Sequence, residues 1–221
     1  MQKFDTAAAV VTVLAVPAGR IRLVASDRTD TTVEILPADP SKGRDVKTAE
    51  RTEVTYTDGV LTIEVPKAKN GILGGTGSIE VTVQLPAGSR VEGRAAAAEL
   101  LTAGRLGDIA FEGAYQQIKI EEAANLRLGA VDGDVEVGRI TGSAEISTQR
   151  GDIRVAEAVS GTVALNTQMG DVTVTAAAGV SASLDAGTAY GRVSNSLKND
   201  GTSALNIQAT TAYGDIAARS L

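Results

Sequence analysis

Carboxylates are the side chains of this sequence that could do chemistry, because it contains neither histidine nor cysteine. Without these two residue types there is no Ser-His-Asp arrangement, no histidine base, no thiolate nucleophile and no zinc site of the usual kind. Two carboxylate pairs remain, Glu121 with Glu122 and Asp132 with Asp134. Such pairs serve glycosidases, so the alternative function is a carboxylate-dependent β-helix enzyme acting on polysaccharide. Acidic pairs on turns are usually only solvated, and we therefore expect no enzymatic activity.

A second set of acidic residues follows glycine at intervals and raises the question of calcium. The pairs are Gly107-Asp108, Gly133-Asp134, Gly151-Asp152, Gly170-Asp171 and Gly214-Asp215, with Gly191-Arg192 as a variant. Calcium-binding rolls need several glycines and an aspartate in every short repeat, and this density is missing, so we expect no metal and no cofactor. Instead, we interpret each pair as a structural turn motif in which the aspartate bonds nearby backbone amides.

The glycine-rich segment 71–78 invites comparison with a phosphate-binding loop. It has no lysine before its Ser or Thr, and an apolar strand pattern follows it where a phosphate loop would be followed by a helix. We therefore predict a hairpin loop.

Short repeated strands are the elements that must carry the Gly-Asp pairs. The glycines at 133, 151, 170, 191 and 214 lie 18, 19, 21 and 23 residues apart, and similar strands begin between them at 142 and 161. Each strand alternates strictly, so its second and fourth side chains share one face. The predicted inward set is Val135, Val137, Ala144, Ile146, Ile153, Val155, Val163, Leu165, Val172 and Val174. Stacked coils would bury this set in one core, with glycine at the corners, where φ above zero is often needed. A meandering antiparallel sheet is the structural alternative.

Residues 1–88 differ from residues 89–221 in character, and the two parts are either separate domains or one continuous domain. Strand patterns occur at 11–14, 21–24, 32–35, 54–56, 61–65 and 79–85. Asp58-Gly59 predicts a hairpin turn, and polar loops are expected at 37–45 and 66–77. The segment 95–101 leaves two alternatives open, a short helix by propensity or the first coil of the stack.

The charge of the chain argues against one class of partner, nucleic acid. The net charge of -6 argues against nucleic-acid binding, which needs clustered Lys and Arg. The sequence shows neither a basic leader with an apolar run nor a membrane-spanning stretch, so a cytoplasmic location is expected.

Tyr190 and Tyr213 share the context Thr-Ala-Tyr-Gly. Either they stack at one corner as a small amphipathic surface, or they cover the end of the core beside a turn.

The strand that ends in Leu85-Pro86-Ala87-Gly88-Ser89, followed by Gly-Asp-Ile/Val strands every ten or twenty residues, resembles a known family. It is similar to bacterial β-strand-repeat proteins of unknown function that are classed as candidate adhesins, over about residues 1–221. The resemblance implies an all-β fold, with a right-handed parallel β-helix-like solenoid behind an N-terminal strand region that is sandwich-like or capping. It implies no catalytic residues.

The function expected from these observations is a non-enzymatic structural or protein-interaction module of adhesin-like type. The last strand pattern begins at Gly214-Asp215-Ile216 and the sequence stops at Leu221 without an obvious polar cap. An uncovered last coil offers unpaired strand edges, which predicts end-to-end self-association as a homo-oligomer. The identity of any other protein partner is not written in the residues.

Overall fold

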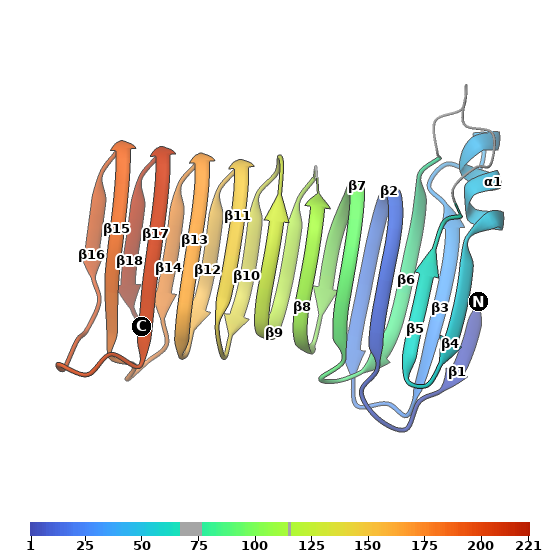
Figure 1. The fold of residues 1–221 in the computed structure, drawn as a ribbon, viewed down its shortest axis with the longest axis horizontal. Helices are drawn as coiled ribbons and strands as arrows, with labels where there is room; N and C mark the ends of the chain where they lie inside the picture. Colours follow the sequence, from blue (N-terminus) through green and yellow to red (C-terminus); the bar gives the residue numbers. More distant parts are fainter. Residues whose placement is uncertain (67–76, 115) are drawn as a thin grey trace.

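The computed structural model describes residues 1–66, 77–114 and 116–221, which form an elongated stack of β-strands with two walls (Figure 1). The predicted hairpin loop at 71–78 lies mostly outside these described residues. Within them, no helix has the length and apolar character needed to cross a membrane.

The elements follow one another from the N-terminal end of the stack toward the other end. In chain order they are β1 (Gln2–Asp5), β2 (Val11–Ser26), β3 (Asp30–Pro37), α1 (Gly43–Arg51), β4 (Glu53–Thr57), β5 (Val60–Glu64), β6 (Ile79–Pro86), β7 (Arg90–Ala103), β8 (Arg105–Ala114), β9 (Ile118–Ala130), β10 (Val135–Ile140), β11 (Ala144–Arg150), β12 (Ile153–Ala158), β13 (Gly161–Met169), β14 (Val172–Ala176), β15 (Ala182–Tyr190), β16 (Val193–Ser196), β17 (Leu205–Tyr213) and β18 (Ile216–Ser220).

Each coil, here called a rung, contributes one strand to each wall. In the front wall, nearer the viewer in Figure 1, β11 pairs in parallel with β9 and β13. In the back wall, β12 pairs in parallel with β10 and β14. The long strands β2 and β7 run through both walls and stay in parallel register from Val11↔Arg90 to Val24↔Ala103. The predicted parallel β-solenoid is therefore confirmed, and the antiparallel meander is wrong for this part of the chain.

The core lies between the two walls and runs along the whole stack. Every residue of the predicted inward set is buried, because alternation places it between the walls. The same buried cluster extends from Val10 near the N-terminus to Ala218 near the C-terminus. The predicted boundary between residues 88 and 89 falls between β6 and β7, while β2, from before this boundary, pairs with β7 from after it.

The N-terminal end of the stack is closed by antiparallel strands. β4 and β5 form a hairpin whose two turn residues, Asp58 (φ 50°) and Gly59 (φ 80°), have left-handed backbone conformations, as the Asp-Gly signal predicted. β3 pairs antiparallel with β6, and β1 with β3. The rings of Phe4 in β1 and Tyr56 in β4 meet across this end, with centroids 5.5 Å apart. This region therefore caps the solenoid.

Two local predictions needed the tertiary structure to be decided. The polar loop expected at 37–45 is only partly a loop, because α1 begins at Gly43. Buried Asp45 and Thr48 accept hydrogen bonds from the backbone N–H groups of Ser78 and Gly77, both at 3.0 Å, and these bonds fix the helix to the chain that enters β6. The segment 95–101 belongs to β7, so its helical alternative is wrong. Pairing with β2 outweighs its helix propensity.

The last rung of the sequence is not the last rung of the stack. β17 pairs in parallel with β13 on one side and with β15 on the other. β18 likewise lies between β14 and β16. After β16 the chain thus returns through residues 197–204 and inserts its final rung one place back. The prediction that the rung starting at Gly214 is uncovered is wrong, and the pair β15 and β16, here called the terminal rung, ends the stack (Figure 1).

Candidate functional site

Four of the five Gly-Asp motifs meet at one corner of the stack, where the chain passes from the front wall to the back wall. Asp134 Oδ1 accepts the backbone N–H of Asp152 at 2.9 Å, and Asp152 Oδ1 accepts that of Asp171 at 2.8 Å. Asp171 Oδ1 then accepts the N–H of Asp215 at 2.7 Å, and Asp215 Oδ1 that of Arg192 at 2.8 Å. The carboxylates therefore join successive rungs, whereas the sequence predicted bonds to amides nearby in the chain.

Arg192 ends this row of aspartates. The sequence places it between Asp171 and Asp215, but the inserted rung moves it to the end of the stack. Its backbone N–H and its guanidinium both bond Asp215, and these contacts lower the pKa of that carboxyl below its ordinary value. The terminal rung consequently offers no aspartate to a further rung at this corner.

Threonines of the preceding strands form further hydrogen bonds between rungs at the same corner, on its buried side. The hydroxyls of Thr167 and Thr211 donate to the carbonyl oxygens of Gly151 (3.1 Å) and Gly170 (3.0 Å), in each case on the neighbouring rung. Both threonines are buried, so these bonds also satisfy groups that would otherwise be unpaired in the core. In two of its copies the Thr-x-x-Gly-Asp pattern therefore supplies two hydrogen bonds between rungs, whereas the Thr148 hydroxyl donates to the carbonyl of Arg150 in its own strand.

Gly107-Asp108 resembles the other motifs in sequence but lies at the opposite corner, where the chain enters the front wall. Asp108 Oδ1 accepts a hydrogen bond from Nδ2 of Asn125 at 2.8 Å, and Asn125 Oδ1 accepts one from the backbone N–H of Ser143 at 2.9 Å. Ser143 Oγ in turn accepts the N–H of Thr162 at 3.2 Å. After Asp108, this second row uses the amide of Asn125 and the hydroxyl of Ser143 in place of carboxylates, which is why the sequence did not reveal it.

The carboxylates suggested for catalysis are engaged in the scaffold. Asp132 Oδ2 pairs with Arg150 at 2.9 Å, and Asp134 holds the next rung as described above. Glu121 Oε2 accepts the N–H of Gly104 at 2.9 Å, and Glu122 lies opposite Arg105 in the neighbouring strand. In the part of the chain that the structure describes, no three acidic side chains gather as a metal site would require.

A shallow groove of about 660 Å³ crosses the front wall beside the second row. It contains Asp108, which the sequence singled out as a turn residue, and Glu145, which it did not. Arg90 lies 3.9 Å from Asp108, and Arg127 lies 3.6 Å from Glu145. Its remaining lining consists mainly of Ala, Ser, Thr and Asn, so the groove presents ion pairs and small polar groups.

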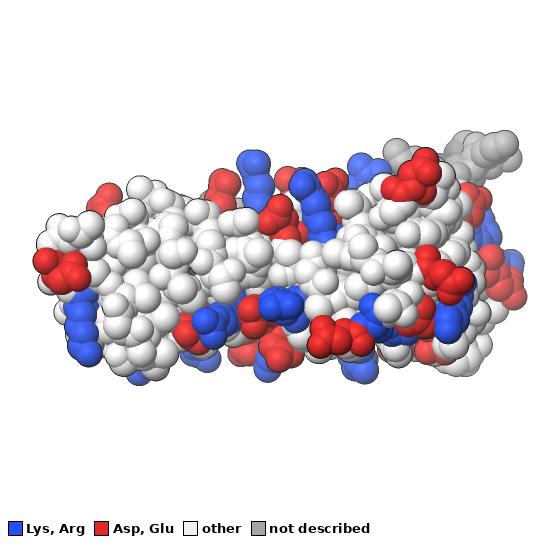
Figure 2. Space-filling view, turned by 90° about the horizontal axis from the view of Figure 1, so that it is seen from below, with Lys and Arg blue, Asp and Glu red and all other residues white. Residues whose placement is uncertain are grey.

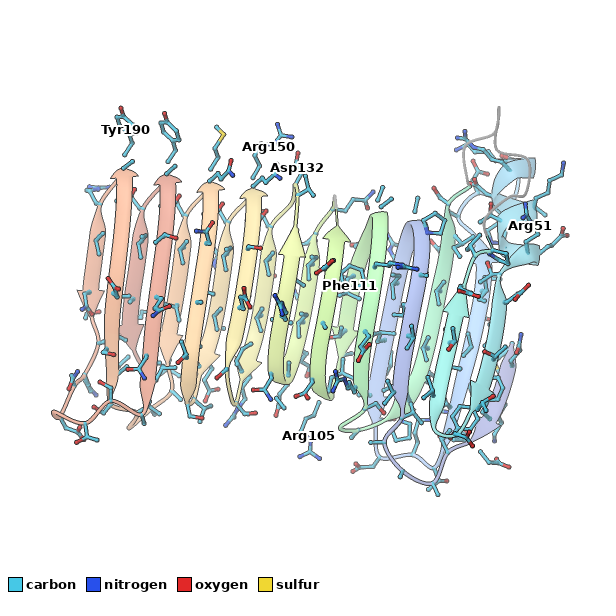
Figure 3. All side chains as sticks on the ribbon, viewed as in Figure 1. Arg51, Arg105, Phe111, Asp132, Arg150 and Tyr190 are labelled. Carbon is cyan, nitrogen blue, oxygen red and sulfur yellow. The ribbon has the colours of Figure 1, made fainter. Side chains whose placement is uncertain are left out.

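An exposed column of side chains runs along the Gly-Asp corner, one from each rung (Figure 3). From the middle of the stack to its end the column is Asp132, Arg150, Met169, Tyr213 and Tyr190. The rings of Tyr190 and Tyr213 stack with centroids 4.9 Å apart and planes 3° apart. Their exposed fractions are 68% and 54%, so the stacked-surface alternative is confirmed and the core-covering alternative is wrong.

The terminal rung exposes core positions that are covered everywhere else. Val193 stands in register with Ile216 and, one rung further in, with Val172. The exposed fraction is 46% for Val193 and 0% for the other two. Leu184 is half-buried, whereas its counterpart Ile207 is buried. The terminal rung and the stacked pair Tyr190 and Tyr213 beside it, here called the tyrosine column, form the candidate binding surface.

Charge distinguishes this surface from the rest of the stack. β13, β17 and β15 contain a single charged residue, Asp185. Viewed from below, basic and acidic side chains intermingle along the middle and N-terminal part, while much of the C-terminal part is uncharged (Figure 2). At the terminal end the charges of Asp185 and of Arg192, which pairs with Asp215, therefore stand among apolar and neutral polar groups.

The chain is similar to solved structures of low sequence identity. No curated protein matches it. A crystal structure of a candidate cell adhesion protein from Clostridium sporogenes matches at 13% identity and a TM-score of 0.39, covering 100% of this chain and 98% of that one. A candidate adhesin from Bacteroides fragilis matches at 16% identity and 0.47, with 98% and 95% covered. One from Parabacteroides merdae matches at 12% identity and 0.41, with 100% and 93% covered.

A protein-family model matches residues 13–220, which is almost the entire chain. This match agrees with the β-strand-repeat resemblance seen in the sequence and with the solenoid seen in the structure. The chain belongs to the Toastrack DUF4097 family.

Proposed function

We propose that this chain is a non-enzymatic protein-interaction module of adhesin-like type, a rigid rod that contacts another protein through its terminal rung. The observation that carries the proposal is the exposure of Val193, at a core position that is fully buried in the rungs behind it. Solenoids normally end in rungs with polar outer faces, because an apolar end is poorly soluble. An apolar end rung is accounted for when a partner covers it.

The two ends of the rod support this assignment by their contrast. At the N-terminal end, antiparallel strands and the contact between Phe4 and Tyr56 close the core. At the other end, Leu184, Ala186 and Val193 continue the apolar pattern of the inner rungs. Asn195 is polar at the position of Ala218, so the cap is partial. The terminal rung is therefore the end better suited to a partner.

A polysaccharide-cleaving enzyme is not the function that we propose. Such an enzyme needs an acid and a base free to exchange protons in a groove. Asp132 and Asp134 hold an arginine and a backbone amide, and the acids of the front-wall groove lie beside arginines. These engagements favour a structural role for the carboxylates.

Self-association through the terminal rung is the form of binding that can be measured with the purified chain alone. Sedimentation velocity over a wide concentration range is expected to show a rise in sedimentation coefficient for the wild-type chain. Val193→Asp should abolish the rise, because it places a charge on the apolar end. Ala156→Asp, at an exposed position of β12 far from this end, is the matched control and should behave as wild type.

Two results would count against a terminal-rung interaction. A wild-type chain that stays monomeric at every concentration would reject self-association. Association that survives in Val193→Asp would place the contact elsewhere on the rod. Equal melting temperatures of the two variants would show that neither result comes from unfolding.

A further inference from the structure

The front-wall strand of the terminal rung has a free edge along most of its length. One side of β15 pairs with β17 in unbroken register from Ala182↔Leu205 to Tyr190↔Tyr213. Among the described residues, no strand pairs with its other side. The N–H of Ala182 donates to the carbonyl of Lys198 at 2.9 Å, so the returning segment 197–204 closes the start and the open edge begins at Ser183. Unpaired N–H and C=O groups on such an edge are a template for another strand.

Apart from the charge of Asp185, this edge lacks the features that usually protect an exposed strand. Edge strands are commonly short, bulged, or interrupted by lysine or proline. β15 has nine residues, none of them lysine or proline, and its register with β17 contains no shift. Its outward residues include Gly187 and Ala189, which leave room for a close approach. By contrast, the edge strands of the capped end, β1 and β4, have four and five residues.

Four pairs of charges that face each other on neighbouring rungs are opposite in sign, unlike the aspartates of the Gly-Asp corner, which bond backbone N–H groups of the next rung. The nitrogen-to-oxygen distances are 3.4 Å for Lys119 with Glu136, 3.6 Å for Arg127 with Glu145, 3.7 Å for Arg139 with Glu157 and 2.9 Å for Arg150 with Asp132. In each pair the two residues are direct partners in the strand register. Asp185 has Gln208 as its partner on the inner side. On the open side, the complementary residue would be basic.

The tyrosine column gives the same edge a second recognition element. Tyr190 is the last residue of β15, and Tyr213 stacks on one side of its ring. Tyr190 stays 68% exposed because its rung is the end of the stack. An aromatic residue at the end of an added strand would continue the stack, and aromatic pairs favour such offset parallel arrangements.

We propose that the free edge of β15 binds an extended strand of another polypeptide, with Lys or Arg opposite Asp185 and an aromatic residue against Tyr190. The inference rests on the proposed function, because it names the partner of the terminal rung. A second copy of this chain complements the edge less well. Its own front-wall edges would bring Asp185 or Glu53, and like charges across strands are destabilising.

A fluorescent peptide provides the test, with fluorescence anisotropy as the readout. The probe is the segment Asn206–Tyr213 with Gln208→Lys, because β17 already shows the register that places residue 208 opposite Asp185. The matched control peptide carries Gln208→Glu. Wild-type protein is expected to bind the lysine peptide about 5-fold more tightly than the glutamate peptide, since favourable and unfavourable cross-strand charges differ. Asp185→Lys should reverse this preference, and Ala156→Lys should leave it unchanged.

The aromatic contact is tested by coupling two substitutions. Tyr190→Ala in the protein and Tyr213→Ala in the lysine peptide should each weaken binding by roughly 3- to 10-fold. Together they should weaken it little more than either alone, because both remove the same contact. Raising salt should reduce the charge preference and leave the aromatic effect in place.

The outcomes separate this inference from the proposed function. Equal binding of the two peptides, or a preference that Asp185→Lys does not reverse, would overturn the strand assignment. If neither peptide binds while the wild-type chain self-associates in a manner abolished by Val193→Asp, the occupant is a second copy. In that case the inference fails and the proposed function stands. If both tests are negative, both proposals fail.

Discussion

Substitution of Gly170 tests the close packing of rungs at the Gly-Asp corner. Gly170 has φ +151°, and a Cβ there would overlap the carbonyl group of Gly151 and reach 3.0 Å from Asp152 Oδ1. Gly170→Ala must therefore strain its backbone and push two rungs apart. Gly179 separates these effects, because its φ is +77° while no atom lies within 4 Å of its added Cβ. At Gly187 the space is also open and φ lies outside the positive region, so Gly187→Ala controls for the change in residue type.

The expected magnitudes follow from the bonds at each position. Gly187→Ala should leave stability unchanged or slightly raised, because alanine restricts the unfolded chain. Gly179→Ala should cost about 1 kcal/mol for the positive φ. Gly170→Ala adds the loss of two bonds between rungs, from the Thr167 hydroxyl to Gly151 and from the Asp171 N–H to Asp152, at about 1 kcal/mol each. Its total is about 3 kcal/mol, or a fall in Tm of roughly 6–12 °C for a chain of this size.

Denaturant unfolding followed by circular dichroism measures these differences, with an unchanged m-value as the check that the same transition is observed. If Gly170→Ala loses no more stability than Gly179→Ala, the contact between rungs does not constrain the corner. The explanation for the repeated glycine would then be backbone conformation alone.

Two further predictions concern individual carboxylates. Asp171→Ala should destabilise the fold by about 1 kcal/mol, because the N–H of Asp215 loses its acceptor. Asp171→Asn should retain most of the stability, because it keeps an oxygen at that position. Equal losses of stability in thermal unfolding would refute the hydrogen-bond role. Hydrogen bonds from Arg28 and Lys3 lower the pKa of Asp30 to about 2 from 3.8, so its contribution to stability is present above pH 3.8 and is lost as the pH falls through about 2. An NMR titration should show this low pKa, with Lys3→Ala raising it, and a wild-type value near 3.8 would contradict the contact.

The repeat itself was predictable because its signals are local. Strict alternation identified the inward residues of the rungs, and Asp58-Gly59 identified a two-residue turn, since each depends only on neighbours along the chain. The stacking of Tyr190 on Tyr213 was also within reach. The rungs of Tyr190 and Tyr213 are neighbours in the stack whichever of the two comes last. By contrast, the whole of α1 was missed, because its buried residues Asp45 and Thr48 are polar and their bonding partners, Ser78 and Gly77, lie far along the chain.

The sequence by itself determined most strands of the repeat, the set of their side chains that faces the core and several of the glycines that bend the chain. Only the tertiary structure decided the order of the last two rungs, and with it which edge is free. Rungs that share the same strand pattern can pair in either order at similar cost, so pairing between distant segments is not encoded locally. One signal favours the observed order: placing Arg192 at the end lets Asp171 accept the N–H of Asp215 and keeps the row of carboxylates unbroken.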